Sequence, residues 1–138
     1  MPDVAPVKHH EQLDSVGTMN AELRIIALNT YMVTRKISEA EKIIQLISDM
    51  DEETPETKLK YSSILGLKAD YKGAIEILLS LNKEFPGKPA ILKRLALGYE
   101  QQRQPKRALA FLKAYNKISP DEDWVKEKMR VFSYVGAL

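Results

Sequence analysis

The apolar positions of this chain recur at a constant interval. In the last copy they are Leu92, Leu95, Ala96, Tyr99, Ala108, Leu112 and Tyr115. Shifting this pattern back by one interval moves its central alanine from Ala108 onto Ala74, and an equal second shift moves it onto Ala40. A period of this size, about 34 residues, is typical of stacked helical hairpins. The pattern therefore predicts three repeats, at residues 21–54, 55–88 and 89–122.

Each repeat contains two segments with helical spacing. In the first segment, residues at i, i+3, i+4, i+7 and i+8 predict a buried helical stripe, made of Leu23, Ile26, Ala27, Thr30 and Tyr31. The repeat pattern instead places the core of that segment at Arg24, Ala27, Leu28 and Tyr31. The two predictions share Ala27 and Tyr31 but are offset from each other by one residue. In the second segment the expected core residues are Ala40, Ile43, Ile44 and Ile47.

Several residues predict where helices begin. Ser38 followed by Glu41 has the spacing of a capping box. Thr54 before Pro55 suits an N-cap and first helical position, because proline lacks the N–H that this position leaves unbonded. Further starts are expected at Asp70, Pro89 and Pro105.

The two ends of the chain have different patterns. Residues 1–20 are polar and interrupted by proline and glycine, which predicts a flexible N-terminal arm. Residues 123–136 are amphipathic, with apolar side chains at Trp124, Val125, Met129, Phe132 and Val135. This segment is expected to be a helix that caps the last repeat. The predicted fold is an all-α superhelix of three helical hairpins and a C-terminal capping helix, one domain over residues 21–138.

Composition narrows the classes of function. The chain has 138 residues and a net charge of +2. It contains no cysteine, which excludes disulfides, thiolate metal sites and cysteine nucleophiles. The N-terminus lacks the apolar run of a secretory signal, and no stretch approaches the roughly 20 apolar residues of a membrane span. A cytoplasmic location is therefore expected.

Candidate catalytic chemistry is sparse. The two histidines, His9 and His10, are adjacent and lie in the predicted arm. The six glycines are scattered, so no glycine-rich phosphate loop is present, and the acidic run near Asp51 lacks the spacing of a calcium loop. We therefore expect no enzymatic activity, no cofactor and no metal site.

Basic residues gather toward the C-terminus. Between Lys88 and Arg130 there are eleven basic and five acidic residues. Such an excess can attract an acidic protein or a nucleic acid, and it can equally be a solvated surface. Nucleic-acid binding would need exposed aromatic side chains among the basic ones, and Tyr99, Phe111 and Tyr115 fall mostly on expected core positions.

The repeating residues resemble the tetratricopeptide repeat family, whose repeats have this length and a similar order of large, small and aromatic positions. The resemblance covers about residues 21–123, although the usual glycine and the usual first tryptophan are absent from all three repeats. It implies paired antiparallel helices that leave a concave groove for a protein partner. The family's clamp for a terminal carboxylate needs five polar positions, of which only Asn29 and Arg94 match, so that mode is not expected here.

The resemblance also implies which residues would face the groove. The expected partner-binding residues are Ile25, Asn29, Met32, Val33, Leu59, Ser63, Leu67, Lys93, Leu97 and Gln101. Several of them are apolar, so the face would bind a helix or an extended apolar segment of a partner. The N-terminal arm, the capping helix or a second copy of the chain could cover the same face instead.

The expected function is therefore a non-catalytic protein-binding module, a chaperone or adaptor that shelters an apolar segment of a partner. In size and in its apolar groove the chain is similar to small three-repeat chaperones of bacterial type III secretion systems. A structural or assembly subunit of a larger complex is the alternative from another class, and a nucleic-acid-associated helical-repeat protein is a third. Homodimers and hetero-complexes are both compatible with the sequence, and no small-molecule substrate is expected.

Overall fold

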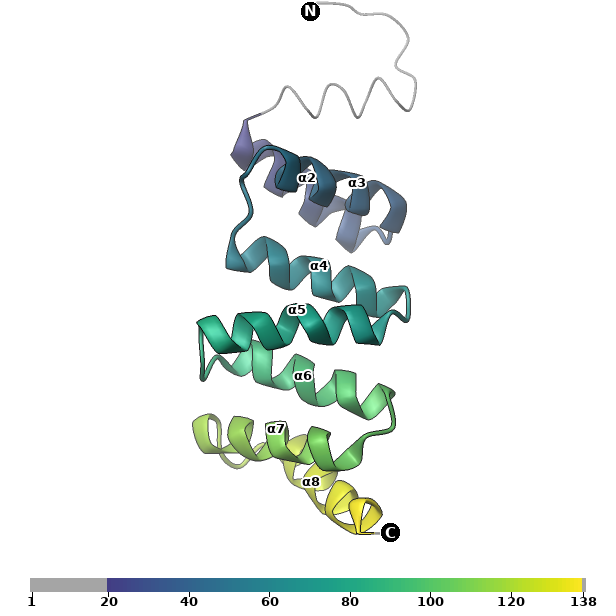
Figure 1. Cartoon of the computed structure of the whole chain (residues 1–138), viewed down its shortest axis with the longest axis vertical. Helices are drawn as coiled ribbons and strands as arrows, with labels where there is room; N and C mark the ends of the chain where they lie inside the picture. Colours follow the sequence, from purple (N-terminus) through teal and green to yellow (C-terminus); the bar gives the residue numbers. More distant parts are fainter. Residues whose placement is uncertain (1–19, 138) are drawn as a thin grey trace, which may run out of the picture. The chain divides into compact units, whose positions relative to one another are not determined.

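The computed structural model describes residues 20–137, and this part of the chain contains seven α-helices and no β-strand (Figure 1). The helices are α2 (Ala21–Val33), α3 (Ile37–Asp49), α4 (Pro55–Leu67), α5 (Tyr71–Glu84), α6 (Pro89–Gln101), α7 (Pro105–Ile118) and α8 (Asp123–Gly136). The predicted all-α fold is confirmed. The chain divides into two compact units, one up to Thr57 and one from Lys58 onward. Residues 1–19 of the predicted arm lie outside the described residues.

The helix starts keep the repeat interval of the sequence pattern. The first helix of each pair begins at Ala21, Pro55 and Pro89, and the second begins at Ile37, Tyr71 and Pro105. The connecting turns keep the interval too, because each contains one non-glycine residue with a positive φ, at Arg35 (61°), Ala69 (62°) and Arg103 (58°). This left-handed residue lets the next backbone N–H bond back to the end of the first helix. The bonds are Lys36–Tyr31, Asp70–Leu65 and Gln104–Tyr99.

Most of the predicted helix starts are confirmed. Thr54 and Thr57 cap α4 reciprocally, since the Thr54 hydroxyl accepts the Thr57 N–H (3.1 Å) and the Thr57 hydroxyl accepts the Thr54 N–H (2.9 Å). Asp70 accepts the N–H of Gly73 at 3.0 Å at the start of α5. Prolines 89 and 105 are the first residues of α6 and α7.

The predicted capping box at Ser38 and Glu41 is wrong. Helix α3 begins at Ile37, and its N-cap is Lys36, which makes no side-chain capping bond. Lys36 occupies the same position of its repeat as the N-caps Asp70 and Gln104 do in theirs. The geometry of the repeated turn therefore sets the start of this helix, and it outweighs the capping preference of the nearby serine.

In the first unit, α2 packs against α3. The predicted core of α3 is confirmed, because Ala40, Ile43, Ile44 and Ile47 are all buried. On α2, however, the buried residues are Arg24 and Leu28, whereas Leu23, Ile26 and Thr30 are exposed. The predicted stripe through Leu23 and Ile26 is wrong by one position. The repeat pattern correctly places the core of this helix at Arg24 and Leu28.

An ion pair explains how α2 can bury a charged residue. The Arg24 side chain is 3% exposed and forms a two-point contact with Glu52, in the loop after α3. Its Nε donates to the Glu52 carboxylate at 2.8 Å, and its Nη2 donates to the second carboxylate oxygen. Such bidentate pairing satisfies the charge and the donors of a buried guanidinium. Counting apolar residues alone could not have placed Arg24 inside.

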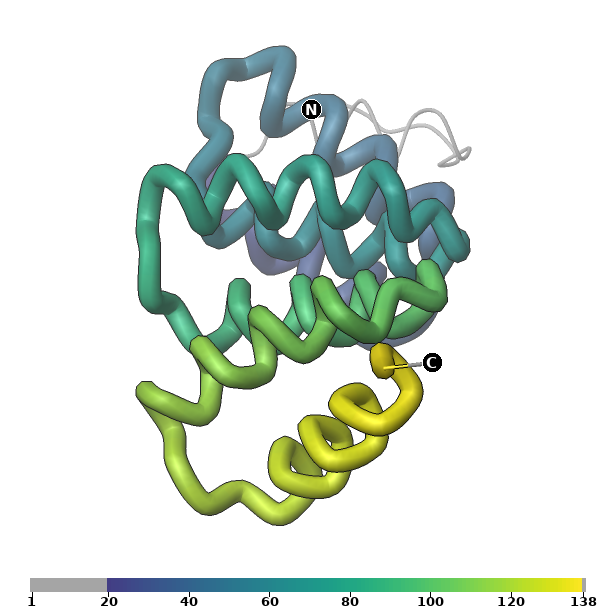
Figure 2. Tube along the Cα trace, turned by 60° about the horizontal axis from the view of Figure 1, so that its bottom comes forward, coloured from purple at the N-terminus to yellow at the C-terminus, as the bar shows by residue number. Residues whose placement is uncertain are grey.

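In the second unit, α5 packs on α6, α6 on α7 and α7 on α8 (Figure 2). The core includes Ile75, Leu78, Leu81, Ile91, Leu92, Leu95, Ala96, Tyr99, Ala108, Leu112, Tyr115, Val125 and Phe132. The recurring alanine is buried here, with Ala74 6% and Ala108 0% exposed, as Ala40 is in the first unit. A methyl group at this position lets neighbouring helices approach closely. The predicted burial of these alanines is confirmed.

Candidate functional site

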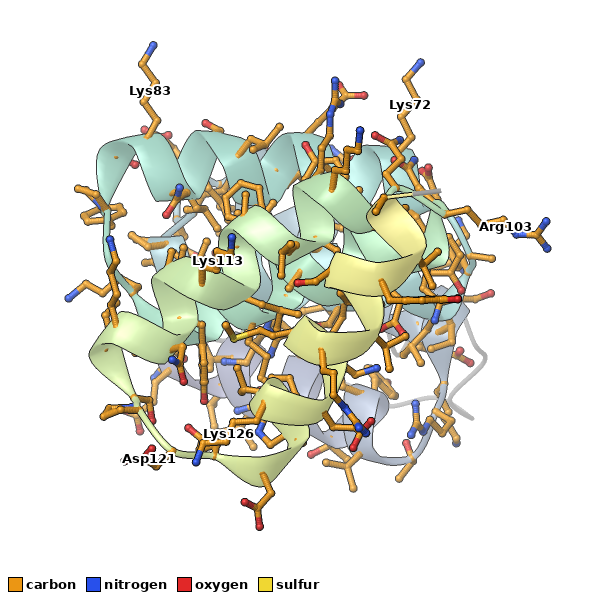
Figure 3. All side chains as sticks on the ribbon, turned by 90° about the horizontal axis from the view of Figure 1, so that it is seen from below. Lys72, Lys83, Arg103, Lys113, Asp121 and Lys126 are labelled. Atoms are coloured by element: carbon orange, nitrogen blue, oxygen red, sulfur yellow. The ribbon has the colours of Figure 1, made fainter. Side chains whose placement is uncertain are left out.

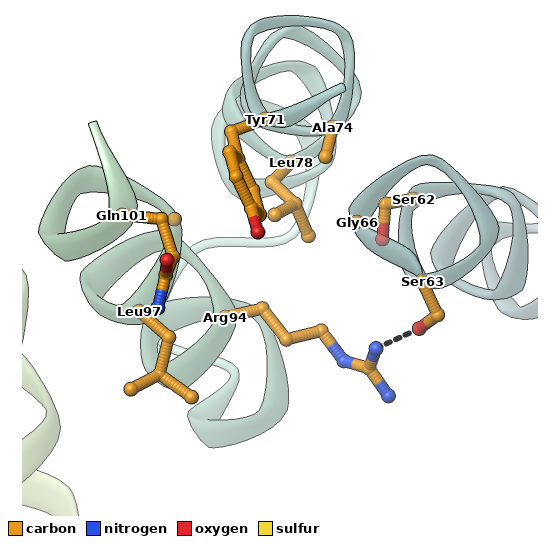
Figure 4. Close-up of a pocket in the computed structure, with 10 residues that line it drawn as sticks. Ser62, Ser63, Gly66, Tyr71, Ala74, Leu78, Arg94, Leu97 and Gln101 are labelled. Atoms are coloured by element: carbon orange, nitrogen blue, oxygen red, sulfur yellow. Dashed lines mark hydrogen bonds between the residues drawn. The ribbon is translucent and has the colours of Figure 1, made fainter. Parts of the chain in front are cut away.

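A hollow of about 160 Å³ opens between α4, α5 and α6 in the second unit (Figure 4). Each of the three helices contributes to it, and its lining is mostly apolar. The lining residues are Ser62, Ser63, Gly66, Tyr71, Ala74, Leu78, Arg94, Leu97, Gly98 and Gln101. An apolar cavity of about 150 Å³ in another protein binds benzene. This hollow is thus large enough for one aliphatic or small aromatic side chain.

Small residues create this space. A Cβ built on Gly66 would meet no atom within 4 Å, so the helix surface there is open. Gly98 is different, because a Cβ there would lie 3.0 Å from Cγ1 of Ile75 on α5. Gly98 therefore allows α5 and α6 to approach closely, whereas Gly66 leaves a vacant volume beside them. Ala74 and Leu78 of α5 form buried parts of the lining.

Arg94 supplies the charge at the hollow. Its side chain extends from α6 toward α4 and donates a hydrogen bond to the hydroxyl of Ser63 (Figure 4). The residue is exposed, yet nearby protein atoms remove enough water from the guanidinium to lower the pKa of Arg94 from its usual value. Arginine nevertheless stays charged at neutral pH. Among the described residues, no carboxylate lies within ion-pair distance of it.

Three of the six residues expected to bind a partner in this unit lie together. Ser63, Leu97 and Gln101 all line the hollow. Leu59 is instead half-buried and packs against the core, and Leu67 is 47% exposed outside the lining. The residues predicted to face a groove all lie on the first helix of each pair, so they do not include the α5 side of the site, formed by Tyr71, Ala74 and Leu78.

Lys93, the sixth of these residues, is directed toward α8. Its ammonium lies 4.9 Å from the ring centroid of Trp124, a cation–π distance. The indole N–H of Trp124 donates to Glu122 at 2.8 Å, and the hydroxyls of Ser119 and Tyr115 donate to the same carboxylate. Hydrogen bonds from Ser119, Trp124 and Tyr115 lower the pKa of Glu122. Lys93 thus belongs to a network that joins α6 and α7 to the start of α8.

The four remaining predicted residues lie in the first unit. Ile25 is half-buried and lines a separate hollow of about 270 Å³ together with Ala21, Glu22, Ile47, Glu52 and Thr54. Met32 is also half-buried, Asn29 is exposed, and Val33 is 81% exposed. In this unit Ile25 alone of the predicted set lines that hollow.

The described residues were also compared with the requirements of a metal site, a base-stacking surface and a membrane span. Residues 20–137 contain no cluster of three potential metal ligands, and the histidines His9 and His10 lie outside this range. Tyr99 and Tyr115 are buried and Phe111 packs against the core, so they are not exposed stacking surfaces for bases. No helix in residues 20–137 combines the length and apolar character needed to cross a bilayer.

Comparison with models of known protein families gave no match to this chain, and comparison with curated proteins gave none either. The recurring helix starts and turns of residues 20–137 are compatible with a helical repeat.

Proposed function

We propose that this chain is a helical-repeat module of the tetratricopeptide type that binds another protein and has no catalytic role. The constant interval of helix starts, turns and buried alanines supports the family assignment. The observation that carries the binding role is the apolar hollow at Gly66, which no side chain of the described residues fills. An apolar, open concavity is the usual form of a binding site for an apolar group.

In this proposal the partner contributes an apolar segment, helical or extended, and the chain shelters it as a chaperone or adaptor. The likeness to small three-repeat chaperones suggests a cytoplasmic role in bacterial protein export, with type III secretion as the specific hypothesis. The sheltered segment would place one side chain in the hollow beside Leu97 and lie across the neighbouring exposed surface.

A second candidate is a structural subunit that stays in a larger complex. The outer face of α8 favours it, because Val131, Tyr134 and Val135 are spaced at i, i+3 and i+4 and are 43%, 73% and 44% exposed. An apolar helical stripe with this much exposure is a typical protein-contact surface.

The two candidates are separated by affinity capture from extracts of the source organism, with bound proteins identified by mass spectrometry. The baits are the wild-type chain, Leu97→Glu in the hollow, and the double variant Val131→Glu with Tyr134→Glu on α8. Circular dichroism first checks that each bait keeps its helical content.

Loss of one specific protein with Leu97→Glu alone supports the proposed module. Loss with the α8 double variant alone supports the subunit. If both variants retain every protein that the wild type captures, neither surface is the binding site and the proposal is wrong.

A further inference from the structure

The hollow at Gly66 carries a more specific inference about the partner, which rests on the proposed function. We infer that the occupant is an aliphatic side chain of a partner segment whose neighbouring residues are acidic. Three features lead to this inference: the vacant space, the charge at its rim and the charge of the whole unit.

The vacant space has no structural need within the described chain. Glycine inside a helix costs about 1 kcal/mol relative to alanine. At Gly98 the close approach of Ile75 accounts for that cost, but at Gly66 a Cβ would meet nothing. The equivalent positions of the other two repeats hold Met32 and Glu100, which have full side chains. The second repeat thus lacks a side chain at this position, and the missing side chain leaves the hollow open.

The charge at the hollow is positive, and no ion pair within residues 20–137 involves it. Arg94 is the one charged side chain among the described residues that line it. Its hydrogen bond to Ser63 uses one donor of the guanidinium, and no carboxylate of residues 20–137 pairs with it. A guanidinium has five N–H donors in a planar fork that fits a carboxylate. A partner's glutamate or aspartate would therefore find free donors there.

The second unit as a whole would attract such a segment. Residues 58–137 contain 16 basic and 8 acidic residues, a net charge of +8, whereas residues 20–57 contain 4 basic and 8 acidic residues, a net charge of −4. Many of the basic side chains, among them Lys72, Lys83 and Arg103, extend away from the helices (Figure 3). Such a field speeds the approach of an acidic partner and weakens with salt.

The test uses three synthetic peptides that are capped at both ends, so that side chains carry their only carboxylates. One contains a leucine flanked by glutamates, one replaces the glutamates by glutamines, and one replaces the leucine by alanine. Each is titrated into the ¹⁵N-labelled full chain at low salt, and the amide shifts of Gly66 and Gly98 give the dissociation constant.

The protein variants separate the contribution of the hollow from that of net charge. Gly66→Met fills the hollow with the side chain that the first repeat carries at the equivalent position, and it improves helix propensity. Arg94→Gln removes the rim charge. Lys113→Gln, on the exposed face of α7 (Figure 3), removes the same charge elsewhere and is the control.

We expect the acidic leucine peptide to shift the hollow amides and to bind roughly fivefold more tightly than the glutamine peptide, which is the effect of about 1 kcal/mol. Arg94→Gln should abolish this preference and Lys113→Gln should keep it. Gly66→Met and the alanine peptide should each weaken binding at the hollow.

Equal binding of the acidic and glutamine peptides would overturn the inference but leave the proposed binding role intact. Equal effects of Arg94→Gln and Lys113→Gln would also overturn it, since the preference would then reflect net charge alone. The inference is also wrong if no peptide changes the amide chemical shifts of Gly66 and Gly98. It is wrong as well if a single-stranded oligonucleotide changes these shifts in a saturable way. The proposed function fails separately, if affinity capture is unaffected by Leu97→Glu.

Discussion

Replacing Ala108 by leucine tests the packing on which the second unit depends. Ala108 is 0% exposed and belongs to the same core cluster as Leu112 and Tyr115. Leucine adds three carbon atoms at a fully buried position, and overpacking of this kind costs roughly 1–3 kcal/mol. For a unit of this size each kcal/mol lowers Tm by roughly 4–8 °C.

The matched control is Ala110→Leu, close by on the same helix. Ala110 is exposed, so the same change in volume and helix propensity should alter stability by less than about 0.5 kcal/mol. Thermal unfolding followed by circular dichroism and by the fluorescence of Trp124, the single tryptophan, measures the Tm of both variants. Equal midpoints for Ala108→Leu and the wild type would refute the close-packed role of the recurring alanine, and so would equal losses in the two variants.

Three further predictions concern other parts of the chain. Gly66→Ala should stabilise the chain by about 1 kcal/mol in thermal unfolding, and Gly98→Ala should gain less, because its Cβ meets a close neighbour; equal gains would contradict the difference between them. Glu52→Ala should cost roughly 3 kcal/mol in urea unfolding by removing the partner of a buried arginine, while exposed Glu53→Ala should cost almost nothing; equal losses would refute the ion-pair role. Because its folded-state pKa is lowered, Glu122 stabilises the fold at pH values above the ordinary glutamate pKa, and this stability is lost as pH falls through the lowered value. The Tm difference between wild type and Glu122→Gln should therefore be largest at neutral pH and shrink in acid, and a difference that grows in acid would contradict this sign.

The sequence predicts the fold well because its signals repeat. Proline at the starts of α4, α6 and α7 marks helix starts directly, since proline fits the first helical position. At α3 the local signal at Ser38 pointed to the wrong residue, because the turn through Arg35 makes Lys36 the N-cap instead. Where local capping and the repeat interval disagree, the interval agrees with the structure.

The site is less predictable from sequence because it depends on what is missing. The family resemblance implied that Ser63, Leu97 and Gln101 face a groove, and these three residues do lie together. The hollow itself arises because Gly66 has no side chain and α5 packs beside it. Whether a glycine leaves a void or allows close contact is set by neighbouring helices, so the roles of Gly66 and Gly98 became distinct only in the structure.

The binding role of the hollow is tested most directly by intermolecular NOEs in the complex with the capped acidic leucine peptide. The proposed binding role predicts contacts from the leucine methyls of the peptide to the methyls of Ala74, Leu78 and Leu97. Contacts to Val33 or to the α8 face around Val131 would contradict it, as would a complex without any contact between methyl groups.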